Sequence, residues 1–485
     1  MRRTLINELH DLQAEHGWLR REDLEALARR TGRPLYELQG LRSFYPHFRN
    51  ELPRPFEVRL CRDASCSLRG GAEAVGALQA ELGRRTDVTL RPASCLGRCD
   101  SAPAATVNDR PCRMEDVAAL VDGREAPALE APVQTWPTDP YPDPGEHYGV
   151  LRRALAGTLS REELFARVEE SGLRGMGGAG FPTGRKWRLV AAQKATPKYA
   201  ICNADESEPG TFKDREIMRQ LPHLVVEGLL LGMWAVEANE GVVFVRHEYG
   251  PEQRVLGAEL ERARALGLVG EEREIQIVTS PGGYILGEES ALIECLEGKR
   301  GEPRNRPPYP VTDGLWGQPT LVNNVETLHH VPATVGQPDR PPPGTEGERQ
   351  GMKFISVSGH VERPGVYCVP FGTTVAELIE RAGGMLEGRA LAAFQPGGAS
   401  SNFLPAAMSG VELDFTSLQA AGSQLGSGAL VVVAEGTDLV GLATNVLEFF
   451  ANESCGKCVP CRVGTRKAIE VEVDVAKTGF SGTAV

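Results

Sequence analysis

The sequence predicts an α/β protein built from several domains. At 485 residues the chain is too long for one hydrophobic core, and its length suggests three or four domains. Apolar strand patterns alternate with helical patterns along most of the chain. Two Pro-rich segments, 126–149 and 337–351, have the composition of linkers. We therefore expect separate folding units on either side of each linker.

The bulk composition narrows the class of protein. A hydrophobic fraction of 41% and a charged fraction of 24% are ordinary for a soluble globular protein. The formal net charge of −12 argues against nucleic acid or an acidic membrane surface as the main partner. No secretory signal follows Met1, and the longest apolar stretch, 224–236, is too short to span a bilayer. We expect a cytoplasmic protein without a membrane span.

The first 125 residues predict a helical lead-in followed by a small α/β domain. Within the lead-in, 1–50, helical patterns end at Gly17 and Gly32, and Pro34 can begin a third helix. The small domain, 51–125, changes to a shorter period. Its expected elements are a strand at 56–60, a helix at 74–82 and strands at 88–90 and 104–107.

Residues 150–336 predict the largest domain. Strand patterns such as 199–202 and 242–245 alternate with helical patterns, which is typical of a parallel sheet covered by helices. The apolar stretch 224–236 contains Glu227 and is expected to be a buried helix of this domain.

Residues 352–435 predict a compact β-rich module. Strand patterns at 354–357 and 365–367 can pair in a hairpin, and a helix is expected to begin at Thr374 with a capping box to Glu377. The final segment, 436–485, is expected to be helical from Asp438 and carries the second cysteine group.

Seven of the eleven cysteines fall in two tight groups. In a cytosolic chain such grouping indicates metal or cluster ligation rather than disulfides. The first group can hold a 2Fe–2S cluster or tetrahedral zinc, and its spacing does not exclude either. The second group has only three thiols, and no fourth cysteine follows it. The groups are Cys61, Cys66, Cys95 and Cys99, then Cys455, Cys458 and Cys461. The remaining four cysteines are expected to be inert, partly buried thiols.

A glycine-rich loop offers a place for phosphate. Gly175, Gly177 and Gly180 form a G-x-G-x-x-G pattern, but a helical pattern precedes it where a dinucleotide fingerprint needs a strand. Glycines allow a backbone to approach phosphate, and Arg185 and Lys186 supply positive charge. An ordinary glycine-rich turn remains the alternative.

Polar side chains gather at three further points of the same domain. Ligands of open α/β sheets bind at the carboxyl ends of strands, so one shared ligand explains these groups better than separate helix caps. They are Asn203, Asp205, Glu206 and Glu208 after the strand at 199–202; Glu288 and Glu289 at the start of an apolar helix; and Asn323, Asn324 and Thr327.

Five ordered motifs identify a family resemblance. They are GMGGAGFPTGRKW, CNADESEPGTFKDR, GGYILGEESALIECLEGKR, RPPYP and PTLVNNVETL. Together they resemble the NADH- and FMN-binding flavoprotein subunit of respiratory complex I over roughly residues 150–465. The same family includes the diaphorase subunits of NAD-dependent formate dehydrogenases and NAD-reducing hydrogenases. The resemblance implies a Rossmann-like FMN/NADH domain at 150–336 and a ubiquitin-like, SLBB-type module at 352–435. It also implies a C-terminal helical 4Fe–4S segment at 436–485, truncated relative to the family.

The resemblance also implies the residues of the flavin site. Glu206, Glu208 and Glu289 would hold the nicotinamide and ribose of NADH, and Glu288 adjoins them. Phe181 and Tyr309 would flank the adenine, with Arg306 where family members often have Lys. Since FMN performs the hydride transfer, the protein's task is positioning, and Glu206 and Glu208 are the expected catalytic positions. The FMN ligands would be Gly175, Gly177, Gly178, Lys186, Asn203, Asp205, Tyr284, Gly287, Asn323, Asn324 and Thr327.

The cysteine groups resemble the family's two cluster motifs. Residues 1–120 are similar to the small thioredoxin-like 2Fe–2S subunit that accompanies the flavoprotein, although the stretch between Cys66 and Cys95 is shorter here. The second group resembles the 4Fe–4S motif, whose fourth cysteine is missing from this chain. The tail, 471–485, also lacks the helical pattern expected of the family.

The fused 2Fe–2S domain and the segment 395–405 look most like the flavoprotein (beta) subunit of soluble NAD-dependent formate dehydrogenase. The implied partners are a molybdenum/iron–sulfur catalytic subunit and a small 2Fe–2S subunit. A complex I flavoprotein, a hydrogenase diaphorase and a non-enzymatic scaffold with degraded cofactor sites are the alternatives.

Overall fold

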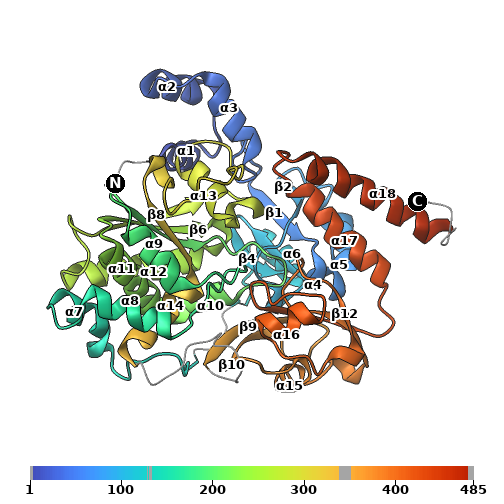
Figure 1. Ribbon diagram of the computed structural model, residues 1–485. Coiled ribbons are helices and arrows are strands. Elements are labelled where there is room, and N and C mark those ends of the chain that lie inside the picture. The colour runs from blue at the N-terminus through green and yellow to red at the C-terminus, as the bar shows by residue number, and fades with distance from the viewer. Residues whose placement is uncertain (1–3, 128, 130–133, 338–350, 479–485) are drawn as a thin grey trace.

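The computed structural model describes residues 4–127, 129, 134–337 and 351–478 (Figure 1). The described strands form three sheets, and a helical lead-in and a helical C-terminal segment flank them. Most of the predicted linker 337–351 lies outside the described residues. None of the described helices has both the length and the apolar character that a bilayer crossing requires.

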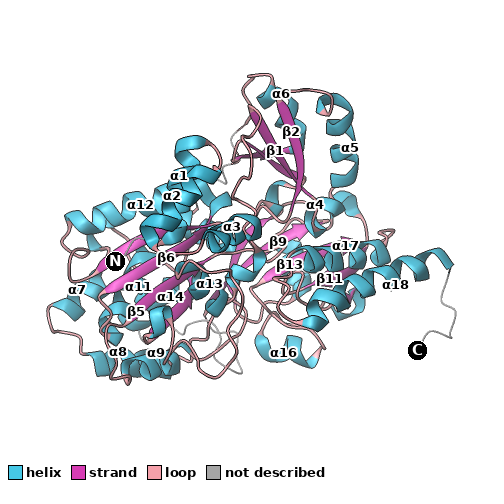
Figure 2. Cartoon of the chain, turned by 90° about the horizontal axis from the view of Figure 1, so that it is seen from above, coloured by secondary structure: helices cyan, strands magenta, loops and turns pink. Residues whose placement is uncertain are grey.

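The first sheet has the strand order β2-β1-β3-β4. Strands β1 and β2 are parallel, and β3 and β4 pair antiparallel beside β1. Figure 2 shows α5 running alongside these strands. The bounds are β1 Phe56–Cys61, α4 Ala64–Leu68, α5 Gly71–Leu82, β2 Val88–Ala93, β3 Ala104–Val107, β4 Arg110–Arg113 and α6 Val117–Val121. The three predicted strands are confirmed, and β4 is an addition.

The second sheet is parallel throughout, with the order β7-β6-β5-β8. Both of its faces are buried, as parallel sheets require. Its strands are β5 Tyr199–Ala204, β6 Glu240–Arg246, β7 Glu274–Ser280 and β8 Thr320–Asn324. Its helices are α7 Gly149–Leu155, α8 Arg161–Glu170, α9 Thr183–Ala191, α10 Lys213–Gln220, α11 Pro222–Val236, α12 Gly250–Ala265, α13 Glu289–Leu296 and α14 Val325–Gly336.

Different helices cover the two faces of this sheet. On one face Cys202 and Val243 pack with the predicted buried helix α11 and with α14. On the other face Ile201 and Phe244 pack with α13 and with the helices of the lead-in. The lead-in therefore completes the core of the second sheet rather than that of the first. Its helices are α1 Leu5–His16, α2 Arg21–Thr31 and α3 Leu35–Phe44, as expected.

The third sheet is mixed, with the order β10-β9-β13-β11-β12. The predicted hairpin is present, with Gly365 opposite Val357. Thr374 and Glu377 form the predicted capping box at the start of α15. The bounds are β9 Met352–Gly359, β10 Gly365–Pro370, α15 Val375–Arg381, β11 Leu391–Gln395, β12 Leu404–Pro405, α16 Phe415–Ala420 and β13 Ala429–Ala434.

Two helices, α17 Leu439–Asn452 and α18 Thr465–Thr478, form the C-terminal segment. The prediction that the tail from 471 lacks helix is wrong as far as Thr478, and 479–485 lie outside the described residues. The alternating valines at 471, 473 and 475 give a strand pattern. However, valine costs a helix only a few tenths of a kcal/mol, roughly, so propagation from the preceding turns prevails.

Candidate functional site

The three predicted polar groups of the second sheet meet at the carboxyl ends of its strands, which we call the ligand edge. Strands β5 and β8 are parallel neighbours, with Asn203 opposite Asn324 and Cys202 opposite Asn323. Although β7 lies at the far end of the sheet, its following loop returns, so that Asn203 Nδ2 donates to the Gly287 carbonyl at 2.8 Å. One ligand at this edge can therefore contact all three groups.

The glycine-rich loop lies over the start of α14. The Met176 amide donates to the Thr327 hydroxyl at 2.8 Å. A Cβ at Gly177 would lie 3.0 Å from the Asn324 Cβ, so the backbone approaches too closely for a side chain. Gly178 has φ +132°, a conformation that L-residues rarely adopt. These features fit a loop that brings backbone amides to a phosphate, as the sequence predicts.

Charged side chains bound the other end of this edge. Lys186 Nζ lies 3.2 Å from a Glu289 carboxylate oxygen, and Arg306 lies 3.2 Å from the second oxygen. Glu288 instead caps α13, accepting from the amides of Ser290 at 3.0 Å and Ala291 at 2.9 Å. Glu288 also pairs with Arg306, whereas Glu289 lies between Lys186 and Arg306.

Two exposed aromatic rings lie beside these charges. Phe181 is 40% and Tyr309 51% exposed, which is unusual for large hydrophobic side chains. The guanidinium of Arg185 lies 5.9 Å from the Phe181 ring, and that of Arg306 lies 5.9 Å from the Tyr309 ring. Exposed aromatic faces with adjacent cations suit stacking on a planar, anionic ligand such as a nucleotide.

The two expected catalytic carboxylates point in different directions. Glu206 is buried and accepts from the Asp214 amide at 2.8 Å, the Arg215 amide at 3.1 Å and the Tyr249 hydroxyl at 3.0 Å. Burial and then the Asp214 charge raise the pKa of Glu206 to about 7. Its carboxylate caps α10, so the structure does not bring it to the ligand edge in the way the sequence suggested.

Glu208 connects the second sheet to the third. One carboxylate oxygen accepts from the Tyr284 hydroxyl at 2.7 Å, and the other accepts from the Ser400 amide at 2.5 Å. Burial raises the pKa of Glu208. A Cβ at Gly398 would lie 2.7 Å from Glu208 Cγ, so the 398–400 turn packs directly on this side chain. Glu208 and Tyr284 therefore act as a unit.

The amides Asn323 and Asn324 are held by protein groups. Trp187 Nε1 donates to Asn323 Oδ1 at 2.9 Å, and Asn324 Nδ2 donates to Asp214 at 2.6 Å. These bonds fix the orientation of both amides, which leaves the remaining Asn323 nitrogen for a ligand.

Asp205 faces a cavity of about 300 Å³ between the first sheet, the second sheet and α17. Burial raises the pKa of Asp205 to about 7. The Arg246 charge and then the hydroxyls of Ser207 and Ser280 oppose this rise. Both carboxylate oxygens are buried and have no hydrogen-bond partner among the described residues. Ser94, Cys95 and Glu453 also line the cavity.

The first cysteine group is assembled and buried. Cys95 Sγ lies 3.5 Å from Cys99 Sγ, and the Ala104 amide donates to Cys66 Sγ at 3.4 Å. The neighbouring thiols raise the pKa of Cys61 and of Cys99 and lower that of Cys95. Four buried, converging thiols fit a thiolate-ligated cluster.

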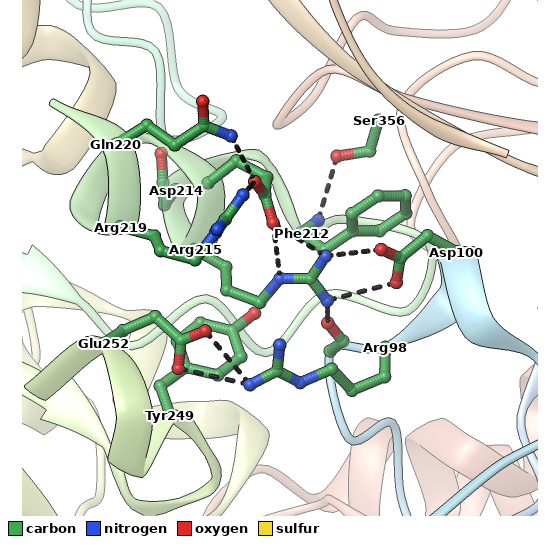
Figure 3. Close-up of polar contacts among 12 residues, drawn as sticks. Arg98, Asp100, Phe212, Asp214, Arg215, Arg219, Gln220, Tyr249, Glu252 and Ser356 are labelled. Atoms are coloured by element: carbon green, nitrogen blue, oxygen red, sulfur yellow. Dashed lines mark hydrogen bonds and ion pairs between the residues drawn. The ribbon is translucent and has the colours of Figure 1, made fainter. Parts of the chain in front are cut away.

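Buried ion pairs dock the first cysteine loop onto the second sheet's helices (Figure 3). Arg215 of α10 bonds Asp100 at 2.6 Å and donates to the Gly97 carbonyl at 2.6 Å. Arg98 pairs with Glu252 of α12 at 3.0 Å. The loop that carries Cys95 and Cys99 is therefore fixed to α10 by buried hydrogen bonds and ion pairs.

Sequence reasoning missed Arg246, the last residue of β6. It donates to the Cys95 carbonyl at 2.6 Å and also to the Glu206 carbonyl. Burial opposes its charge, but the carboxylate of Glu248, together with Tyr249 and Cys95, outweighs burial and raises the pKa of Arg246. The rule that ligands gather at strand ends would have drawn attention to Arg246, because it ends a central strand.

The second cysteine group lies between α17 and α18. Cys455 is half-buried, and Cys458 and Cys461 are exposed. Cys461 Sγ donates to the Ser454 hydroxyl at 3.3 Å. These residues place three thiols on one loop, which fits three ligands of a 4Fe–4S cluster and leaves its fourth ligand unassigned.

A further group with ligand chemistry lies apart from these sites. Asp139, His147 and His223 bring three potential ligand atoms within 4.8 Å of one another. The two imidazoles stack in parallel at 3.7 Å, so their in-plane lone pairs do not converge. Arg262 also lies 2.6 Å from His147 Nδ1. The group is a stacked pair beside a carboxylate rather than a metal site.

Four family models match successive parts of the chain. They are the thioredoxin-like [2Fe-2S] ferredoxin at 1–122, the Nuo51 FMN-binding domain at 168–333, the SLBB domain at 354–403 and the NADH-ubiquinone oxidoreductase-F iron-sulfur binding region at 441–481. Their order agrees with the predicted order of domains, whose boundaries stay predictions.

Curated relatives are matched over most of their own length. The F subunit (copy 2) of NADH-quinone oxidoreductase from Rhizobium meliloti (strain 1021) is 44% identical over 344 residues, 67% of this chain and 80% of the relative. The chain belongs to the family of these F subunits. The F subunit of NADH-quinone oxidoreductase from Escherichia coli (strain K12) is 43% identical over 340 residues, 67% of this chain and 75% of the relative. This member of the family is therefore an oxidoreductase subunit of the NADH dehydrogenase type, with an FMN-binding domain and two iron–sulfur regions.

One solved structure matches this chain over nearly its whole length. It is the NAD+-reducing [NiFe]-hydrogenase in the air-oxidized state, 32% identical with a TM-score of 0.86. The match covers 98% of this chain and 85% of the hydrogenase chain. The H2-reduced state of an NAD+-reducing [NiFe]-hydrogenase matches at 33% identity, with a TM-score of 0.87 and the same coverage.

Proposed function

We propose that this chain is the NADH-oxidising diaphorase subunit of a multi-subunit NAD-dependent formate dehydrogenase. It would take electrons from NADH at FMN and pass them to the iron–sulfur clusters. The observation that carries the proposal is a hydrogen-bonded bridge between the cysteine loop and the ligand edge. Arg246 joins the main chain of the cluster loop at Cys95 to that of the flavin-side loop at Glu206.

FMN, when bound, accepts a hydride from NADH and can release its electrons singly. The chain's own residues hold and orient the reactants. The glycine loop and Lys186 would hold the FMN phosphate, and Asn203, Asn323, Asn324 and Thr327 would fix the rest of the cofactor. Glu208 and Tyr284 would set the nicotinamide position, since they hydrogen-bond each other at the strand ends. Phe181 and Tyr309 would stack on the adenine, with Glu289 and Arg306 beside it.

The first cysteine group would hold the 2Fe–2S cluster, and the second would hold the 4Fe–4S cluster. The fit for 2Fe–2S rests on four buried, converging thiols. The fit for 4Fe–4S rests on three thiols, and its fourth ligand is unassigned.

Two features support the proposal: the first favours a diaphorase over a complex I flavoprotein, and the second favours formate dehydrogenase. The structural match to the hydrogenase chain extends over 98% of this chain, whereas the curated F-subunit relatives align with 67% of it. The segment 395–405 resembles the formate dehydrogenase beta subunit, and its Ser400 amide contacts Glu208. Molybdenum/iron–sulfur and small 2Fe–2S subunits would then be the partners.

The diaphorase subunit of an NAD-reducing hydrogenase is the second candidate, which the same structural match favours. Purification of the intact assembly followed by metal analysis separates the candidates. Stoichiometric molybdenum would support formate dehydrogenase, nickel would support hydrogenase, and membrane subunits would support complex I.

An anaerobic NADH titration of the full chain tests the electron route itself. Prompt bleaching of both flavin and iron–sulfur absorption is expected, with an electron count that gives the number of intact clusters. Flavin bleaching without cluster bleaching would contradict transfer to the clusters. A colourless protein would favour the scaffold alternative.

A further inference from the structure

Glu453 lies at the junction of the three redox sites. It follows the last residue of α17 and precedes Cys455 by two residues. The Tyr284 amide donates to one of its carboxylate oxygens at 2.8 Å. The Ser94 hydroxyl donates to the other oxygen, and Ser94 immediately precedes Cys95. One carboxylate therefore connects both cluster loops to the flavin side.

The Tyr284 end of this connection reaches the ligand edge. Its hydroxyl bonds Glu208 at 2.7 Å, so Tyr284 links the two carboxylates, with its backbone amide on Glu453 and its side-chain hydroxyl on Glu208. The Tyr284 ring also packs edge-on against Phe449 of α17, with ring centroids 5.0 Å apart. A shift of α17 would therefore move both ends of Tyr284.

The surroundings of Glu453 favour a specific role over a chance surface contact. Glu453, Ser94, Cys95 and Tyr284 line one cavity of about 300 Å³. A second bond supports the same alignment, because Asn445 of α17 donates to the Arg62 carbonyl at 2.9 Å, next to Cys61. Helix α17 is thus attached to both loops of the first cysteine group.

We propose that Glu453 is a positioning residue. It holds the loop of Cys455, Cys458 and Cys461 in place relative to the Cys95 loop and to Tyr284. It would set the separation of the clusters from the flavin, on which electron transfer depends. Its negative charge would also favour the oxidised state of both clusters, since reduction adds negative charge beside it. This inference rests on the proposed function.

Two substitutions separate position from charge. In Glu453→Gln, the amide carbonyl can still accept from the Tyr284 amide while the amide nitrogen donates to the Ser94 hydroxyl, so geometry is kept and charge is lost. In Glu453→Ala both bonds are lost. Glu448→Ala is the matched control, because Glu448 lies on the exposed side of the same helix.

The measurements are rapid mixing with NADH and EPR-monitored redox titration of both clusters. For Glu453→Ala we expect cluster reduction by NADH to slow by tenfold or more, with dithionite-reduced EPR spectra of normal intensity. For Glu453→Gln we expect a rate near the wild type and cluster midpoint potentials shifted upward. Glu448→Ala should match the wild type.

Wild-type rates and potentials in both Glu453 variants would overturn the inference, as would equal slowing in both. If Glu453→Ala fails to retain its clusters, the potential shift of Glu453→Gln still decides the role of the charge. If the wild-type chain itself shows no cluster reduction by NADH, the proposed function fails instead.

Discussion

Glu206 and Glu208 stand two residues apart, yet their carboxylates have different surroundings. Glu206 accepts hydrogen bonds from the first amides of α10 and from the Tyr249 hydroxyl. Glu208 bonds Tyr284 and the Ser400 amide. Because both residues follow a strand end, the sequence predicted both as ligand contacts. Only the tertiary packing decides which of the two carboxylates binds the N-terminal amides of α10. Of the two, Glu208 is the better candidate for orienting NADH.

Glu208→Gln should impair NADH oxidation and leave FMN bound. The variant keeps the shape of the side chain and its contacts but loses the charge. Since a hydrogen bond to a charged group contributes about 1.5–3 kcal/mol, we expect kcat/KM for NADH to fall roughly 10–100-fold. Steady-state kinetics and flavin content per chain measure this. Glu272→Gln, at a side chain 87% exposed, is the control. Loss of flavin in Glu208→Gln would reassign the residue to FMN binding.

Glu227 predicts a pH dependence of stability. It is buried in α11, where it accepts from the Tyr141 hydroxyl at 2.9 Å and the Leu151 amide at 3.0 Å. Burial raises the pKa of Glu227 to about 7 from an ordinary value of 4.5. Between these values the folded chain holds a proton that the unfolded chain has lost. Its contribution to stability is therefore fully present below pH 4.5 and is lost as the pH rises through 7.

The Glu227→Gln variant should remove this component. The expected slope is about 1.4 kcal/mol per pH unit at most between those pH values. Urea midpoints at pH 5 and pH 8 should show the variant gaining on the wild type at the higher pH. A constant difference between the two proteins would contradict a raised pKa at Glu227.

At the scale of the element, the glycine loop shows how a weak pattern gains meaning. The G-x-G-x-x-G pattern is common, and α8 in place of a preceding strand argues against an ordinary dinucleotide fingerprint. The structure places the loop against Asn324 and Thr327 at the start of α14. Most helices and strands were predictable because their periodicity is local. The part of α18 from Val471 was not, because the valine alternation around 471–475 competes with helix propagation.

Gly177→Ala should weaken FMN binding. An added Cβ would lie 3.0 Å from the Asn324 Cβ, and Asn324 cannot retreat without losing its cap of α14 and its bond to Asp214. We expect FMN affinity to fall at least tenfold, or about 1.4 kcal/mol, in a fluorescence titration of deflavinated protein.

Gly257→Ala in α12 is the matched control for this loop. An added Cβ there meets nothing within 4 Å, so FMN affinity should not change and stability should rise by about 0.5–1 kcal/mol. Equal FMN affinity in Gly177→Ala would place the phosphate away from this loop.

At the scale of the whole molecule, buried charges connect the second and third sheets. Glu326 of α14 bonds Lys213 at 2.9 Å and Lys353 of β9 at 2.6 Å, and the Phe354 amide donates to it at 3.0 Å. Lys213 also pairs with Asp214 at 2.7 Å, which in turn accepts from Asn324. The β-rich module is thus attached directly behind the glycine loop.

Glu326→Gln should destabilise this junction strongly. It leaves two fully buried lysines with Asp214 as their remaining carboxylate in the group. Removal of one partner from a buried ion pair costs about 3–5 kcal/mol. A lower denaturant midpoint with loss of FMN is expected, and Glu380→Gln on the exposed side of α15 is the control. An unchanged midpoint would show that the module contributes little to the fold of the second sheet.

The sequence by itself determined the order of the domains, most elements, the two cysteine groups and the family motifs. These properties depend on local periodicity, on residue type and on spacing along the chain. Only the tertiary structure decided that the lead-in helices cover the second face of the parallel sheet and that Glu206 caps α10. It also decided that Arg246 and Glu453 join the cysteine loops to the loops that follow β5 and β7. Such contacts bring together residues far apart in the chain, and hydrogen bonds among buried groups are selected by packing that no single segment encodes.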